Sequence, residues 1–319
     1  MDHPTVSLQE TDRVEILTLM DNYVDVLLTN TSVVYRPPLA KSGRIPADTL
    51  VAEHGLSLLI TLYQGDQTHT ILFDTGYSSI GVMHNMALLE IDPGALEALV
   101  ISHGHMDHTG TLYPLLDTIP GPVPLVVHPD AFLSPRYFAL DDGRKLLFPE
   151  ILKKSELKKR NVKVMESTGP TLLAGAMALV TGEVERTTTY EKGLPNALLE
   201  RNGVIEKDLI LDDQAIVVRV KGKGLVVIAG CAHAGIMNTI LYAMKLTGVS
   251  RVHAVLGGFH LSGAFFEPII EDTIEDLKKL DPRILVPMHC TGWKAINRFS
   301  EAFPEAFILS SVGSRFTVS

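Results

Sequence analysis

Apolar, β-branched runs recur along the chain, each bounded by Gly, Asp or Pro, and such runs predict strands. In the first half, the predicted strands are Val14–Met20, Leu56–Tyr63, Thr70–Phe73, Leu99–Ser102 and Pro124–Val127. In the second half, they are Ala215–Val220, Leu225–Ala229, Val252–Leu256 and Ile284–Met288. Two glycines, Gly222 and Gly224, supply the positive φ angles of a hairpin turn between two of these strands.

Two segments of the second half show helical periodicity. Residues Ile236–Leu246 carry apolar side chains on one face and stop at Gly248, which predicts a helix with a glycine C-cap. Residues Pro268–Leu280 place isoleucines and leucines at helical spacing, with acids and lysines on the opposite face. Because strands and helices alternate across both halves, the pattern predicts an α/β architecture with buried sheets.

The middle of the chain, about residues 130–212, departs from this alternation. It is richer in charge and contains the lysine-rich run Leu152–Arg160, which is typical of a solvated helix face. It also contains the polar stretch Gly182–Glu191, which is long enough to fold over a pocket. No proline- or serine-rich linker separates this segment. We therefore predict one domain over residues 1–319, with an elaboration at about 130–212 that forms the rim of a substrate site.

The composition narrows the class of partner. The chain has 319 residues, 46% of them hydrophobic, and a net charge of −9, which disfavours nucleic acid and anionic membranes as partners.

No apolar segment reaches the about 18 residues of a membrane-spanning helix, and the N-terminal segment lacks the pattern of a signal peptide. The two cysteines, Cys231 and Cys290, lie far apart and form no disulfide framework, so we expect a cytoplasmic location.

The segment with the most potential metal ligands follows the predicted strand Leu99–Ser102. His103, His105, Asp107 and His108 come within six residues, and divalent metals such as zinc take imidazole nitrogen and carboxylate oxygen readily. His103 and His105 can share one metal, and Asp107 and His108 can reach a second metal nearby. Three histidines and an aspartate in so short a window favour a metal site over a polar loop.

In the second half, a histidine follows shortly after the end of each of three predicted strands. His233, His260 and His289 follow Leu225–Ala229, Val252–Leu256 and Ile284–Met288. In open α/β sheets, ligands bind at the carboxyl ends of the strands. The pattern therefore predicts that these histidines join the first cluster at one edge of the fold.

The segment Ser102–Gly110 resembles the His-x-His-x-Asp-His signature of the metallo-β-lactamase superfamily, and Ile71–Gly76 resembles the strand signature that accompanies it. This resemblance implies a four-layer αββα fold, in which two packed mixed β-sheets are flanked by helices. Further segments resemble the dihydropterin synthase-like branch of the superfamily: Asp21-Asn22, Glu53–Ser57, Gly230–Ile236, Gly257–Leu261 and His289–Gly292.

The resemblance implies two divalent metal ions, zinc first, with iron or manganese as alternatives. The implied ligands are His103, His105 and His233 for one metal, and Asp107, His108 and His289 for the other. His260 is the alternative to His289.

The chain departs from the commoner pattern at Cys231, which stands where many members carry a metal-bridging aspartate. The bridge is then either the Cys231 thiolate or water. Asp74 is expected behind the ligands, where a carboxylate can accept the free N–H of a ligating histidine, or else as a turn cap. Glu53 and His54 are expected either to line the substrate site or to belong to a hydrogen-bond network within their loop.

Three functions fit this constellation. The branch resemblance implies a transferase acting on a pyrophosphorylated dihydropterin, and the superfamily resemblance implies a hydrolase; the third is a metal-binding ligand sensor without turnover. In the hydrolase, Asp107 or a metal-bound hydroxide is the candidate base, and His260 is a second catalytic candidate if His289 is the ligand. The expected partner is a phosphorylated small molecule held by cations of the elaboration, with Arg186 as the first choice among Arg144, Lys145, Arg186 and Lys192. The alternative for Arg186 is a surface ion pair with Glu183 or Glu185. A homo-oligomer is compatible with the sequence.

Overall fold

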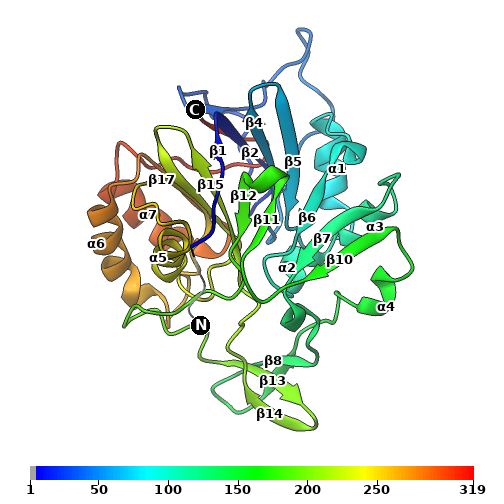
Figure 1. The fold of residues 1–319 in the computed structure, drawn as a ribbon, viewed down its shortest axis with the longest axis vertical. Coiled ribbons are helices and arrows are strands. Elements are labelled where there is room, and N and C mark those ends of the chain that lie inside the picture. Colours follow the sequence, from blue (N-terminus) through cyan, green and yellow to red (C-terminus); the bar gives the residue numbers. More distant parts are fainter. Residues whose placement is uncertain (1–4) are drawn as a thin grey trace.

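The computed structural model describes residues 5–319 and is built around two mixed β-sheets that pack face to face (Figure 1). The first sheet follows the order β10 (Val162–Glu166), β7 (Val123–Val127), β6 (Ala98–Val100), β5 (Gln67–Phe73), β4 (Ser57–Gln64), β2 (Arg13–Met20), β19 (Arg315–Val318) and β3 (Val34–Tyr35). The second follows the order β11 (Thr171–Leu173), β12 (Ala178–Val180), β15 (Ala215–Val220), β16 (Gly224–Ala229), β17 (Val252–Gly258) and β18 (Ile284–Met288), and β1 (Glu10–Thr11) pairs with β15.

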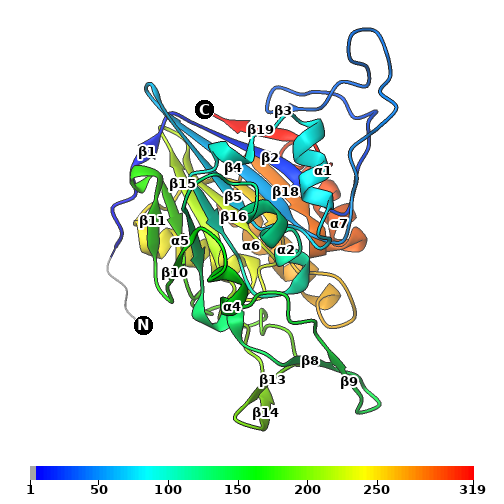
Figure 2. The ribbon, with the colours of Figure 1, turned by 90° about the vertical axis from the view of Figure 1, so that its right-hand side faces the viewer.

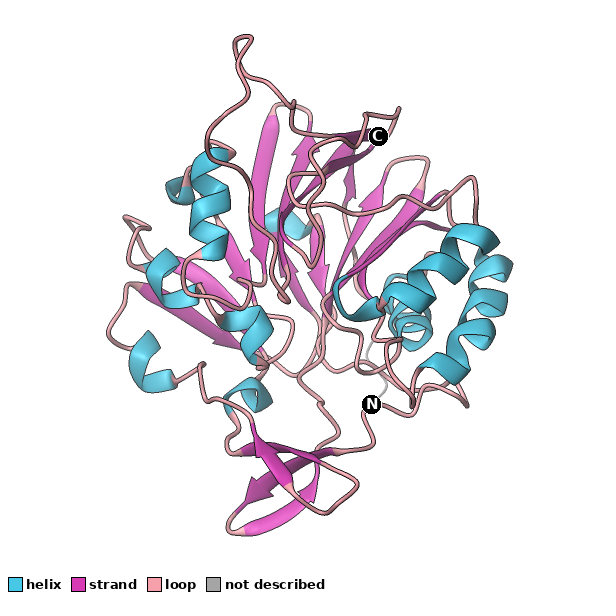
Figure 3. Cartoon of the chain, turned by 180° about the vertical axis from the view of Figure 1, so that it is seen from behind, coloured by secondary structure: helices cyan, strands magenta, loops and turns pink. Residues whose placement is uncertain are grey.

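Helices cover the outer face of each sheet, and Figure 3 shows the strands lying between two groups of helices. The first sheet is covered by α1 (Gly81–Leu88), α2 (Met106–Thr109), α3 (Leu112–Leu116) and α4 (Lys154–Leu157). The second is covered by α5 (Ile236–Thr247), α6 (Ile270–Leu280) and α7 (Trp293–Ala302). The four-layer αββα architecture is therefore confirmed. Among residues 5–319, no helix has the length and apolar character needed to cross a membrane.

Strand β16 shows why the central strands read as continuous apolar runs. Val226 and Ile228 face the first sheet in the central core, whereas Leu225 and Val227 face the helices on the other side. All four side chains are fully buried. Because both faces of the strand are covered, the alternation of polar and apolar residues disappears.

A third, smaller sheet projects from one end of the molecule (Figure 2). It follows the order β14 (Val204–Lys207), β13 (Ala197–Arg201), β8 (Arg136–Ala139) and β9 (Lys145–Leu147), all within the predicted elaboration. Arg136 ties this sheet to the body: its Nη2 is 2.7 Å from Asp212 Oδ1, and Asp212 Oδ2 accepts the N–H of Gly104 at 2.7 Å. The elaboration is thereby anchored beside the histidine cluster.

The predicted strands and helices are found within a few residues of their predicted bounds. Gly248 takes a left-handed conformation (φ 68°) and its N–H bonds to the carbonyl of Met244, as a C-cap does. One strand ends early: β6 stops at Val100, because the N–H of Ser102 bonds to the carboxylate of Asp74 rather than to a neighbouring strand.

The central core makes a testable contribution to stability. We expect Ile228→Ala to lower the free energy of unfolding by about 2–5 kcal/mol, since the cavity it leaves lies between two sheets that cannot collapse onto it. The matched control is Leu241→Ala on the outer face of α5, where the side chain is 37% exposed; its cost should be about 1 kcal/mol or less. Chemical denaturation of both variants measures the difference, and equal costs would contradict this account of the core.

Candidate metal centre

The predicted ligands meet at one edge of the two sheets. His103 follows β6, His105 is the N-cap of α2, and Asp107 and His108 lie within α2. His233, His260 and His289 follow β16, β17 and β18 of the other sheet. The site is therefore assembled from loops of both sheets, at the carboxyl ends of the strands.

The first group of potential ligands consists of His103, His105 and His233. His103 Nε2 is 3.0 Å from His105 Nδ1 and 3.2 Å from His233 Nε2. Donor atoms at about 2 Å from one tetrahedral zinc ion stand roughly 3.3 Å apart, so these three nitrogens fit the ligands of a single ion. All three rings are buried. The resemblance implied the same set.

The second group consists of Asp107, His108, Cys231 and His289. Asp107 Oδ2 is 3.3 Å from His289 Nε2 and 3.6 Å from His108 Nε2, and His108 Nε2 is 3.2 Å from Cys231 Sγ. In the part of the chain that the structure describes, His289 Nε2 is buried without a hydrogen-bond partner, as an unprotonated metal-binding nitrogen would be. A mixed set of nitrogen, oxygen and sulfur donors suits a borderline-soft divalent ion.

Cys231 of the second group also lies within reach of His233 of the first group and of His260. Cys231, His233 and His260 form a third set of donor atoms within mutual reach, and the rings of His233 and His260 are 4.3 Å apart. Of the two options that the sequence left open for the last ligand of the Asp107–His108 group, the structure brings His289, not His260, next to Asp107. His260 instead faces the side on which a cavity opens.

The buried carboxylate of Asp74 fixes the protons of two ligand rings. Its Oδ2 is 2.6 Å from His108 Nδ1 and accepts the hydroxyl proton of Ser102 at 2.7 Å. The Ser102 oxygen is then available to accept the Nδ1 proton of His103 at 2.9 Å. With both Nδ1 atoms protonated, the Nε2 atoms of His103 and His108 present lone pairs to the two ligand groups.

Burial and charge give the ligands different proton affinities. Burial lowers the pKa of His103 and His233 well below the usual range and that of His105 to about 4, so these rings are neutral at pH 7. Burial also lowers the pKa of His108, but the charges of Asp74 and Asp107 overcome it and raise this pKa to about 9. Without a metal, His108 therefore carries a proton that an incoming ion has to displace.

Two glycines allow the loops to close around the site. A Cβ on Gly110 would collide with the carbonyl oxygen of Tyr77, and a Cβ on Gly230 would collide with the side chain of Ser102. Gly230 comes just before Cys231, so the absence of its side chain lets the β16 loop approach the Asp74–Ser102 pair. Glycine is therefore needed at both positions because of this close packing, and not because of a positive φ angle.

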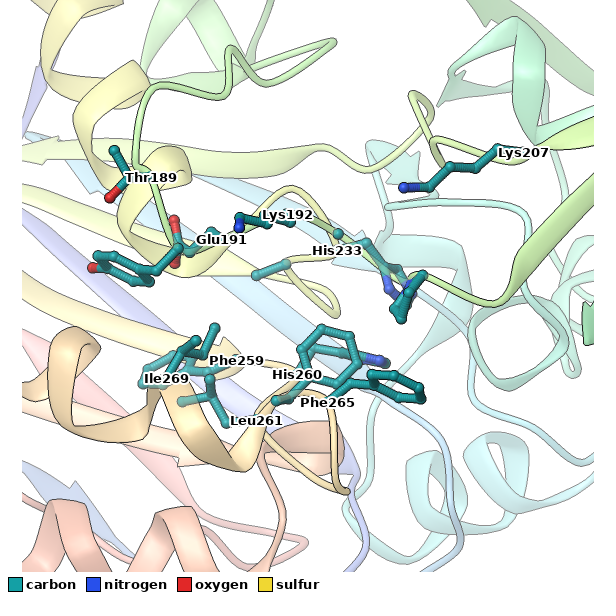
Figure 4. Close-up of a pocket in the computed structure, with 16 residues that line it drawn as sticks. Thr189, Glu191, Lys192, Lys207, His233, Phe259, His260, Leu261, Phe265 and Ile269 are labelled. Carbon is teal, nitrogen blue, oxygen red and sulfur yellow. The ribbon is translucent and has the colours of Figure 1, made fainter. Parts of the chain in front are cut away.

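A cavity of about 500 Å³ opens beside His233 and His260 (Figure 4). Lys192 and Lys207 come to it from the elaboration, and Phe265 and Phe266 come from the loop after β17. Within residues 5–319, neither lysine forms an ion pair. The cavity combines cations, aromatic rings and the edge of the ligand cluster.

Three predicted substrate residues lie around this centre in different ways. His54 is exposed, and its Nε2 is 3.8 Å from Asp107 Oδ2. Glu53 matches the second of its two predicted options, because its carboxylate accepts the N–H groups of Tyr77 and Ser78 and so holds the adjacent loop. Arg186 is not among the residues that line the cavity. Its guanidinium lies beside Gly193 and donates to the carbonyl of Leu209.

Several residues support the centre in roles that the sequence motifs did not predict, although Asp21 lies in a segment that resembles the dihydropterin synthase-like branch. Buried Asp213 accepts the N–H of Ala234 at 2.9 Å and so fixes the loop that carries His233. Burial raises the pKa of Asp213 to about 6. Buried Asp21 accepts the N–H of His289 at 2.9 Å. These aspartates precede or follow strands, as turn residues commonly do, so only their long-range partners reveal their role.

Comparison with known proteins gives consistent similarities. Residues 53–289 match the sequence profile of the metallo-beta-lactamase superfamily. The chain is 34% identical over 263 residues (80% of this chain, 87% of the relative) to the 7,8-dihydropterin-6-methyl-4-(beta-D-ribofuranosyl)-aminobenzene-5'-phosphate synthase of Methanocaldococcus jannaschii. It is 34% identical over 268 residues (82% and 92%) to an uncharacterized protein of the same organism. A crystal structure described as a metal-dependent hydrolase of the beta-lactamase superfamily has a TM-score of 0.72 at 27% identity, covering 96% of this chain and 99% of the other.

Metal content tests the ligand groups. We expect His103→Ala, His108→Ala and His233→Ala each to lower the metal bound per chain, and His233→Ala to lose more metal than His260→Ala. His233 Nε2 faces His103 Nε2, whereas His260 lies toward the cavity. Elemental analysis of protein expressed with ample zinc, iron and manganese provides the measurement, with His84→Ala on α1 as the control. A reversed order for His233 and His260 would show that the first group is wrongly assigned.

The different pKa values of His108 and His105 predict the order in which the two ligand groups lose metal as the pH falls. Below pH 9 a metal must displace the proton of His108, so affinity at the second group should fall by up to about tenfold per pH unit. The first group contains His105, whose pKa is about 4, and should be insensitive to pH over the same range. Dialysis at stepped pH followed by elemental analysis should therefore show loss from the second group first. Simultaneous loss of all metal would contradict this order.

Proposed function

The chain belongs to the metallo-beta-lactamase superfamily, and from that premise we propose that it is a metal-dependent transferase with a dinuclear site that acts on a phosphorylated aromatic small molecule. The proposed reaction is the one that the name of its Methanocaldococcus jannaschii relative describes, the joining of a dihydropterin to a ribofuranosyl-aminobenzene phosphate. Similarity to that relative over 80% of this chain supports the substrate class.

The observation that carries the proposal is the composition of the cavity next to the ligands. On one side Lys192 and Lys207 supply cations, and the otherwise acidic chain needs such a lining to attract a phosphate. On the other side Phe265 and Phe266 supply flat apolar surfaces for an aromatic ring. The ring of Phe266 is also 4.7 Å from that of His260, which places this surface beside the ligand groups.

The two ligand groups favour a pair of ions over one. Each group brings at least three donor atoms of its own, and Cys231 lies close to both. We propose His103, His105 and His233 for one ion and Asp107, His108, Cys231 and His289 for the other, with zinc as the first candidate and iron or manganese as alternatives. When bound, such ions would supply positive charge that stabilises phosphate oxygens and a departing pyrophosphate.

The chain's own residues would bind and orient the substrates. In the proposed reaction, a bond forms between the methylene carbon of the pterin and the aromatic amine or its ring carbon, while the bond from that methylene to pyrophosphate oxygen breaks. The nucleophile loses one proton, and pyrophosphate departs with the electron pair. His260 reaches the cavity wall and is the side chain best placed to take that proton, whereas Asp107 is engaged with His108 and His289.

A hydrolase is the second candidate function. The structure with the TM-score of 0.72 is described as a metal-dependent hydrolase, and the same site could direct water instead of an amine at the substrate. The two functions differ in their requirement for a second substrate. The appended sheet supports the transferase, because Lys207 of β14 lines the cavity and adds a cation to Lys192 for a second, phosphorylated substrate.

Turnover distinguishes the two functions. We expect metal-loaded protein to release pyrophosphate from 6-hydroxymethyl-dihydropterin pyrophosphate only when the ribofuranosyl-aminobenzene phosphate is present, with a coupled product visible by mass spectrometry. Lys192→Ala and Lys207→Ala should each raise KM about tenfold through the loss of a charge-assisted contact. Metal content should not change, and Lys221→Ala in the distant β15–β16 turn is the control. Release without the second substrate would identify a hydrolase, and no release at all would refute the proposed substrate class.

A further inference from the structure

Asn22 lies between the imidazoles of His54 and His289 on the exposed side of the metal centre. Its Nδ2 is 3.0 Å from the carbonyl oxygen of His289 and 3.2 Å from His54 Nδ1. Its Oδ1 is 3.4 Å from His289 Nδ1. A carbonyl oxygen can only accept a hydrogen bond, so the atom facing it has to be the NH₂ group. The orientation of the Asn22 amide is thereby fixed.

This orientation determines where both rings carry their protons. The NH₂ group gives its second hydrogen to His54 Nδ1, which must accept it, so the ring proton of His54 resides on Nε2. The Asn22 Oδ1 atom accepts from His289 Nδ1–H, which leaves the lone pair of His289 on Nε2, toward Asp107. The Asn22 amide therefore leaves His289 Nε2 unprotonated and free to bind a metal, and it leaves His54 Nε2 protonated and able to donate a hydrogen bond.

Within residues 5–319, the N–H group of His54 Nε2 has no hydrogen-bond acceptor. Asp107 Oδ2 is 3.8 Å away, which is too long for a hydrogen bond. The His54 side chain is 65% exposed and its ring stands 5.0 Å from that of His289. The N–H is therefore accessible to an oxygen atom of a molecule that reaches Asp107 and His289.

We infer that His54 donates its Nε2–H to a phosphoryl oxygen of the substrate, and that Asn22 is the positioning residue that aims this donor. The inference rests on the proposed function for the chemistry of the ligand. Because Nε2 keeps its hydrogen whether the ring is neutral or charged, His54 does not act as a base through this atom. It would recognise an oxyanion beside Asp107 and His289, whereas Lys192 and Lys207 line the cavity beside His233. The anion-binding surface would then reach both ligand groups.

The tautomer can be measured without any substrate. In metal-loaded protein with ¹⁵N-labelled histidine, long-range ¹H–¹⁵N correlation should show the His54 proton on Nε2, with His54→Gln used to assign its signals. Asn22→Asp replaces the NH₂ group by an oxygen at nearly constant shape, and we expect it to move the His54 proton to Nδ1. A wild-type ring protonated at Nδ1, or a ring unaffected by Asn22→Asp, would overturn the role of Asn22.

Inorganic pyrophosphate is the probe for the donor. Calorimetry on metal-loaded protein should show that His54→Phe binds pyrophosphate about tenfold more weakly, as expected for the loss of one hydrogen bond to a charged group. His54→Gln retains an N–H donor and should recover most of the affinity, and His84→Phe on α1 is the control. Metal content is measured for each variant. Unchanged affinity in His54→Phe would overturn the role of His54 alone, whereas failure of the wild-type protein to bind pyrophosphate would overturn the ligand class together with the proposed function.

Discussion

The carboxylate of Asp74 is the constraint on which the metal centre depends. It lies fully buried at the end of β5 with a positive φ of 61°, and it accepts the N–H and the hydroxyl of Ser102 as well as His108 Nδ1. Isolated, such a charge would be costly to bury, but three donors compensate it. In return the carboxylate decides which nitrogens of His103 and His108 remain free. A neutral residue here would leave the protons of both rings undetermined.

Two of the histidines that follow the strands of the second sheet are also held by hydrogen bonds to side chains that do not bind the metal. Asp213 and Asp21 hold the loops of His233 and His289 through backbone N–H groups, and Asn22 fixes ring protons as Asp74 does. The appended sheet adds a separate constraint, since the Arg136–Asp212 pair connects it to the loop of His103 through Gly104. The basic wall of the cavity is thereby kept in a fixed relation to the ligands, although its residues come from the most polar part of the chain.

The sequence predicted the strands and the ligating histidines because both depend on local patterns, whereas the four-layer arrangement was implied by the resemblance to the superfamily. Buried strands such as β16 read as apolar runs, and each ligating histidine follows such a run directly. The supporting residues could not be predicted in this way, because Ser102, Asp213 and Asn22 act through partners far away in sequence. The same limit applies to the cations of the cavity. Arg186 and Lys207 both lie in the polar middle segment, and only the pairing of β13 with β14 brings Lys207 to the cavity while Arg186 donates to a backbone carbonyl.

Because the ligand groups draw on loops of both sheets, an ion bound there also joins the two halves of the central core. Binding to the native state alone stabilises it by RT ln(1 + [L]/Kd), or about 1.4 kcal/mol for each tenfold rise in free metal above Kd. The unfolded chain scatters His105 and His233 and cannot reproduce the site. Metal supply would then act as a thermodynamic regulator of the whole fold, so that a cell short of the ion would hold a less stable protein as well as a less active one.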